Sequence, residues 1–85
     1  MIAAADQFGP WAPDLEEAEQ RARLRALRQT ARLLAGPRAI GLCRLLAQAE
    51  TDPAALEPAS YALNTLAAAD RRQILASYAT LARAT

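Results

Sequence analysis

The sequence contains no histidine, no lysine and a single cysteine, Cys43, among its 85 residues. Without histidine the usual zinc-ligand patterns are missing, and one cysteine cannot form an intramolecular disulfide. No glycine-rich phosphate-binding loop is present, and Ser60 and Ser77 have no recognisable activating partner. These absences predict that the protein is not an enzyme and that it uses no metal, no cofactor and no small-molecule substrate.

Long hydrophobic runs are missing as well. No stretch of about 18 apolar residues without a charge occurs, so we expect no membrane-spanning segment. The first residues lack the basic start and the apolar run of a signal peptide. Together with the single cysteine, this start predicts a cytoplasmic protein.

Alanine and leucine dominate the residues that are present. The hydrophobic fraction of 53% is well above that of a disordered chain, whereas aromatic residues make up only 5%. Few residues are β-branched or aromatic, which favours helix over strand. Because alanine buries little area, we expect the core to consist of leucines together with Ile40, Tyr61, Ile74 and Tyr78. The predicted fold class is all-α: a small three- to four-helix bundle with an extended N-terminal arm.

Prolines and a glycine near the start separate an arm, residues 1–13, from a single helical domain, residues 14–85. Two prolines and a glycine lie close together in the arm and oppose regular structure. The arm also carries Phe8 and Trp11, two of the four aromatic residues. Two interpretations stay open: both rings fold back over one end of the bundle, or Trp11 anchors a partner, since tryptophan is enriched at binding hot spots.

The first helix is predicted to begin at Asp14, which has capping-box spacing to Glu17, and to end at Ala35. Gly36 then supplies a left-handed cap, and a second helix occupies residues 37–50. This second helix is apolar nearly all round, which is typical of a helix in the middle of an assembly.

Pro58 and Asp70 set the expected limits of the last two helices. Because proline disfavours the helical conformation of the residue before it, the third helix is predicted to cover residues 58–66. Asp70 has the spacing of a capping box, which predicts a fourth helix over residues 71–84. One continuous helix over residues 58–84 is the main alternative, because the alanines between the two would not interrupt it.

Charge is partitioned along the chain, although the net charge is only +1. Residues 1–20 carry five acids and no base, and residues 21–49 carry seven arginines and no acid. Such a partition indicates that surface charge orients or recruits a partner.

The arginines of the first helix form a stripe beside a line of leucines. Arg21 and Arg23 each follow a glutamate by four residues, so we expect local ion pairs there. The arginines with no acid three or four residues away are Arg25, Arg28 and Arg32. Leu24, Leu27, Ala31 and Leu34 recur at helical spacing next to this stripe.

Several interpretations of the stripe stay open. It could be a solvated face, or an amphipathic membrane-surface helix over residues 21–34, which the acids upstream oppose. In an antiparallel dimer, the acidic start of one copy would meet the stripe of the other and the leucines would be covered. Our main hypothesis is a protein–protein interaction or regulatory module, acting as a homodimer. Its predicted partner-binding residues are Arg25, Arg28, Arg32, Leu24, Leu27 and Trp11.

The alternative hypothesis is DNA binding. The third and fourth helices could form a helix-turn-helix in which Arg71, Arg72 and Gln73 reach base edges. Against it, the sequence pI is about 8.0 and the third helix has no basic residue. Nucleic acid is therefore a less favoured partner than protein.

Overall fold

Helices make up most of the chain that the computed structural model describes, which is residues 9–84, the last three by their backbone alone. The elements, in chain order, are α2 (Glu17–Ala35), the 3-10 helix η1 (Gly36–Ala39), α3 (Ile40–Ala49), the 3-10 helix η2 (Pro53–Ala55), α4 (Leu56–Asn64) and α5 (Ala68–Ala84). Residues 9–84 contain no strand, so the predicted all-α class is confirmed. Within residues 9–84, no helix combines the length and the hydropathy that a membrane-spanning segment requires.

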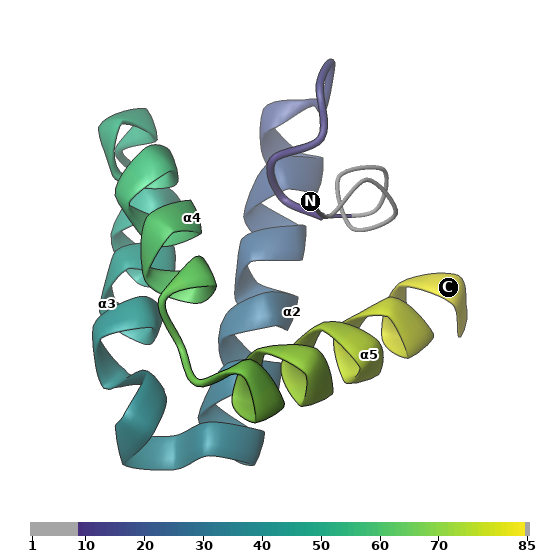
Figure 1. Cartoon of the computed structure of the whole chain (residues 1–85). Coiled ribbons are helices and arrows are strands. Elements are labelled where there is room, and N and C mark those ends of the chain that lie inside the picture. Colours follow the sequence, from purple (N-terminus) through teal and green to yellow (C-terminus); the bar gives the residue numbers. More distant parts are fainter. Residues whose placement is uncertain (1–8, 85) are drawn as a thin grey trace.

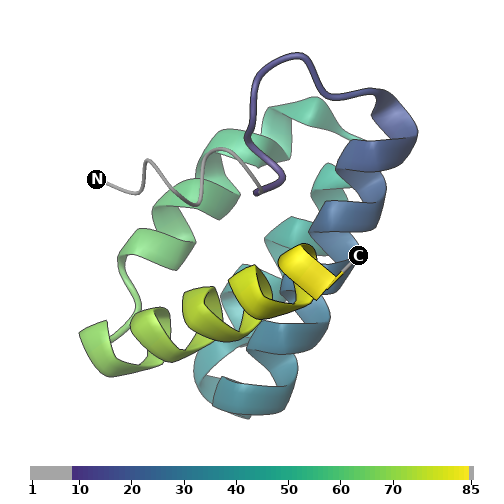
Figure 2. The same ribbon diagram turned by 90° about the vertical axis from the view of Figure 1, so that its right-hand side faces the viewer.

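Helix α2 is the centre of the arrangement. It packs against both α3 and α5, while α4 packs against α3. Figure 1 shows α3 and α4 side by side and α5 running away from them across the lower part of α2. In the perpendicular view of Figure 2, α5 again crosses α2. Helices α4 and α5, although consecutive, scarcely touch each other.

The core consists mainly of leucine and alanine from α2, α3 and α4, and α5 contributes Ile74 and Tyr78. The prediction that these two residues are buried is confirmed. The same prediction was wrong for Ile40 and Tyr61, whose side chains are 56% and 71% exposed. Helix α3 buries only the side that carries Leu42, Leu46 and Ala49, so its other side, with Ile40, faces outward.

The start of α2 differs from the prediction. Asp14 has a φ of 61°, in the left-handed region, and does not cap the helix. Helix α2 begins three residues later at Glu17, after Glu16 in an extended conformation that provides no side-chain cap. The predicted end at Ala35 is confirmed, and Gly36 follows it with a φ of 54°.

Pro58 lies inside α4, which begins two residues earlier than predicted. A proline in the first turn of a helix costs no hydrogen bond, because the first N–H groups have no partner within the helix. The helix starts at Leu56 directly after η2, whose cap Asp52 accepts a hydrogen bond from the N–H of Ala54 at 3.0 Å.

The chain after α4 forms two helices, as predicted, but the break is at residues 65–67 and not at Asp70. Asp70 lies in the first turn of α5, where its carboxylate accepts hydrogen bonds from Arg38 at 2.8 and 3.0 Å. Arg71 stabilises the break, since its guanidinium donates to the carbonyls of Asn64 and Leu66 at 3.1 and 3.3 Å. The acid that resembled a helix cap therefore ties α5 to η1.

Residues 9–13 fold back against the helices. The indole N–H of Trp11 donates to the carbonyl of Leu56 at 2.7 Å, and Gln20 of α2 donates to the carbonyl of Pro10 at 3.1 Å. The described part of the predicted arm is therefore turned and packed rather than extended. Phe8 lies outside the described residues, and the division of the chain at residue 13 stays a prediction.

Candidate partner-binding groove

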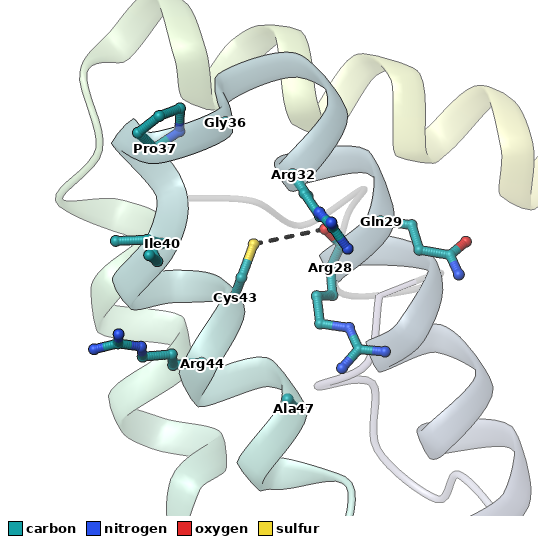
Figure 3. A pocket seen from close by; sticks show the side chains of 9 residues that line it. All are labelled: Arg28, Gln29, Arg32, Gly36, Pro37, Ile40, Cys43, Arg44 and Ala47. Carbon is teal, nitrogen blue, oxygen red and sulfur yellow. Dashed lines mark hydrogen bonds between the residues drawn. The ribbon is translucent and has the colours of Figure 1, made fainter.

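A groove with a volume of about 720 Å³ lies between α2 and α3, beside the turn that joins them. Figure 3 shows that its two walls come from different helices. Helix α2 contributes Arg28 and Arg32, and the α3 side carries Ile40, Cys43, Arg44 and Ala47. We call this feature the α2–α3 groove.

Helical periodicity explains why these side chains meet. Leu24, Leu27 and Ala31 point into the core, which places the arginines one residue after the buried positions, Arg28 and Arg32, at the edge of α2. These two arginines are four residues apart and therefore one turn apart on the same face. Cys43 and Ala47 have the same spacing on α3. The lining extends from Arg28 to Gly36 and from Ile40 to Ala47, so the two walls run alongside each other for about two turns.

Glu50, just after α3, forms ion pairs with two arginines of the stripe. Its carboxylate lies 2.8 Å from Nε of Arg25 and 3.7 Å from Nη2 of Arg28, and its side chain is only 12% exposed. Arg25 and Arg28 therefore have a tertiary ion-pair partner that lies 25 and 22 residues away in the sequence. Local spacing along the first helix could not indicate this partner.

Arg32 and Arg44 are different, because neither forms an ion pair or side-chain hydrogen bond with any residue in the described range. Both are exposed at the groove. Two unpaired guanidinium groups thus lie on opposite helices, with the apolar side chains of Ile40, Cys43 and Ala47 at the same groove.

Cys43 is half-buried, and its thiol lies 3.7 Å from the carbonyl oxygen of Arg28 (Figure 3). Burial raises the pKa of the Cys43 thiol, and the positive charges of Arg28 and Arg32 only partly oppose this effect. The thiol is therefore protonated at neutral pH and a weak nucleophile. Among the described residues, no group of three histidine, cysteine, aspartate or glutamate side chains is placed to hold a metal ion.

The two leucines of the predicted partner surface lie elsewhere. Leu24 and Leu27 are 0% and 1% exposed in the core of the single chain, so a partner cannot reach them while the chain is folded. Trp11 is half-buried against α4 and does not line the groove. Of the six predicted partner-binding residues, the structure brings only Arg28 and Arg32 into the groove, with Arg25 next to them through Glu50.

The residues of the alternative hypothesis are also separated. Arg71 is occupied by the carbonyls at the end of α4, whereas Arg72 and Gln73 are exposed on α5. In a helix-turn-helix the two helices pack against each other, but α4 and α5 scarcely touch. The arrangement of α4 and α5 is therefore not that of a helix-turn-helix.

Sequence reasoning missed the α3 wall of the groove. A signal was present, because Gly41, Arg44 and Gln48 interrupt an otherwise apolar helix at positions three and four residues apart. That spacing marks an exposed face. Ile40 borders this face, which explains its exposure.

No family model, curated protein or solved structure matches this chain.

Proposed function

We propose that the protein is a helical protein-interaction module and that the α2–α3 groove is its contact surface. One observation carries the proposal: the guanidinium groups of Arg32 and Arg44, which have no ion pair among the described side chains, lie on opposite helices at a groove that also exposes apolar side chains. Interfaces are enriched in arginine, and an apolar centre with a charged rim is their usual composition.

The chemistry of the groove favours binding over catalysis. Its one nucleophile, Cys43, has a raised pKa, and no base or carboxylate lines the groove with it. Burying the exposed part of Ile40 would contribute roughly 1 kcal/mol, since complete burial of such a side chain is worth about 1.5–3 kcal/mol. Each exposed arginine adds about 0.2–1 kcal/mol when it pairs with a carboxylate.

Self-association as a homodimer stays a prediction within this proposal. The leucines that a dimer was expected to cover are already buried in one chain. The small size of the chain still favours association, because a domain of 85 residues has a limited core.

Capture of proteins from an extract of the native host tests the proposal with matched variants. Arg44→Glu and Arg72→Glu make the same charge change at exposed helical arginines that have no ion pair among the described residues, but only Arg44 lines the groove. We expect wild type and Arg72→Glu to retain the same proteins, and Arg32→Glu and Arg44→Glu to lose them. The retained protein is then purified and bound to each variant directly.

Equal capture by all four proteins would show that the groove is not the contact surface. Far-UV circular dichroism of each variant serves as the folding control. Because both substituted groove arginines are exposed, we expect all spectra to be the same.

A further inference from the structure

We propose that the occupant of the α2–α3 groove is an acidic amphipathic helix of another protein. This inference rests on the proposed function and adds the chemistry of the partner. It follows from three properties of the groove: its length, its apolar surface and the placement of its charges.

The length of the groove corresponds to about two turns of helix. On the α2 side it extends from Arg28 to Gly36, and on the α3 side from Ile40 to Ala47. At 1.5 Å per residue, both walls are about 11–12 Å long. A third helix that lies between two neighbouring helices is the usual way in which such a groove is filled.

The apolar side chains of the groove require an apolar stripe on the partner. Ile40 is 56% exposed, and Cys43 and Ala47 are half-buried beside it. Their spacing of three and four residues repeats every turn, so leucine-like residues at i, i+3 and i+4 of a docked helix would meet them.

The charges require carboxylates on the flanks of that stripe. Arg28 and Arg32 lie one turn apart on α2, and Arg44 lines the groove from α3 with its side chain pointing away from α2 (Figure 3). Glu50 is 3.7 Å from Arg28, so it weakens the attraction for acids at that end. The strongest preference for a carboxylate is therefore expected around Arg32, toward η1.

A second copy of the chain fits the groove less well than a foreign acidic helix. Four of the exposed acids among the described residues, Asp14, Glu16, Glu17 and Glu19, lie at or just before the start of α2, and Glu57 lies on α4. Glu17 and Glu19 already pair with Arg21 and Arg23. Nucleic acid fits less well again, because a phosphate backbone gains nothing from the exposed Ile40.

Cys43 provides a readout located in the groove itself. It is the only cysteine, so alkylation by iodoacetamide at fixed pH reports on access to this position alone. The probe is a fluorescent 14-residue helical peptide with leucines at i, i+3, i+4 and i+7 and glutamates on both flanks. Two control peptides replace the glutamates by glutamine or the leucines by serine.

We expect the glutamate peptide to bind at least about tenfold more tightly than its glutamine version in low salt, and increasing salt to reduce this difference. Alkylation of Cys43 should slow in proportion to the fraction of protein bound. Arg32→Glu and Arg44→Glu should each weaken binding about five- to tenfold, whereas the control Arg72→Glu should not.

Equal binding of the glutamate and glutamine peptides, with Cys43 protected by both, would overturn the acidic chemistry and leave the proposed function intact. Protection of Cys43 by a higher concentration of the protein alone would show that a second copy occupies the groove, and would overturn the inference of a foreign acidic helix. Protection by a random DNA duplex but by no peptide would overturn both this inference and the proposed function. Peptide binding that leaves Cys43 reactive would show that the peptide binds outside the groove, and would overturn this inference.

Discussion

At the scale of single residues, Trp11 shows how one contact separates two interpretations of the same side chain. An aromatic residue between prolines is compatible with a free anchor and with a folded cover. The structure has the indole N–H bonded to the Leu56 carbonyl at 2.7 Å, which joins residues 45 positions apart. This contact supports a structural role for Trp11.

Replacement of Trp11 should therefore reduce stability. We expect Trp11→Ala to lower the free energy of unfolding by about 2–4 kcal/mol through lost packing, and Trp11→Phe by about 1 kcal/mol through the lost hydrogen bond. Urea unfolding followed by far-UV circular dichroism measures both. Unchanged stability of Trp11→Ala combined with weaker capture of a partner would instead restore the anchor interpretation.

The Asp70–Arg38 pair has a consequence for pH dependence. The hydrogen bonds from Arg38 hold the pKa of Asp70 below its ordinary value, and the attraction of the opposite charge acts in the same direction. A carboxyl group with a lowered pKa contributes stability above its unfolded pKa of about 3.9, and this contribution is lost as the pH falls through the folded pKa.

We therefore expect Arg38→Gln to be less stable than wild type at pH 7, and the two proteins to become more alike at pH 2. Arg72→Glu is a poor control here because it adds a titrating group, so Arg72→Gln is used instead. Urea unfolding at both pH values gives the comparison. A difference between wild type and Arg38→Gln that is the same at both pH values would show that the pair does not act through the charge of Asp70.

At the scale of elements, the ends of the helices depend on both local and distant residues. The end of α2 was predictable, because Gly36 adopts a positive φ that other residues avoid. The start of α2 was not, because residues 9–13 bind to α2 and α4 and set the direction from which the chain enters the helix. Similarly, Asp70 has the spacing of a capping box, but its carboxylate accepts a hydrogen bond from Arg38, 32 residues earlier.

Two glycines give opposite predictions for the same substitution. An added Cβ meets no atom within 4 Å at either Gly36 or Gly41, so only backbone conformation distinguishes the two. We expect Gly36→Ala, at a φ of 54°, to destabilise by about 1–2 kcal/mol. Gly41→Ala, inside α3, should stabilise by about 0.5–1 kcal/mol. Equal thermal midpoints for the two variants would contradict the positive φ of Gly36 in the turn after α2.

At the scale of the whole molecule, α5 is attached differently from the other helices. Helix α2 packs against α3, and α3 packs against α4, so each contacts the next helix along the chain. Helix α5 instead packs mainly on α2 and scarcely touches α4. Among the described side chains of α5, which end at Leu81, Ile74 and Tyr78 are buried and Leu81 is 54% exposed. From residue 79 to Leu81, α5 therefore adds no buried side chain to the core.

Amide hydrogen exchange should reflect this arrangement. We expect the amides of α2 around Leu27 and Ala31 to exchange most slowly, at the rate of global unfolding, and those of α5 beyond Tyr78 to exchange much faster. The middle of α3 serves as an internal control and should resemble α2. Uniform protection along α5 equal to that of α2 would show that the four helices open as one unit.

The candidate site was only partly predictable from the sequence. The stripe of Arg25, Arg28 and Arg32 was identified because arginines repeat at helical spacing within one helix. Its partner Glu50 was not, since a single helix carries no information about what packs beside it. The spacing of Gly41, Arg44 and Gln48 marks an exposed face on α3, but it does not show that this face lies beside the stripe. Leu24 and Leu27 were assigned to a partner surface because helical spacing does not show whether an apolar face packs against the same chain or against a partner.

The helical class, the end of the first helix and the position of the arginines on it follow from the sequence alone, because propensity, glycine conformation and helical periodicity are local properties. The packing of the helices was needed to show that Leu24 and Leu27 belong to the core, that Glu50 pairs with Arg25 and Arg28, and that Arg32 and Arg44 line one groove. Burial and ion pairing depend on which surfaces meet, and the segments that meet here are distant in the chain.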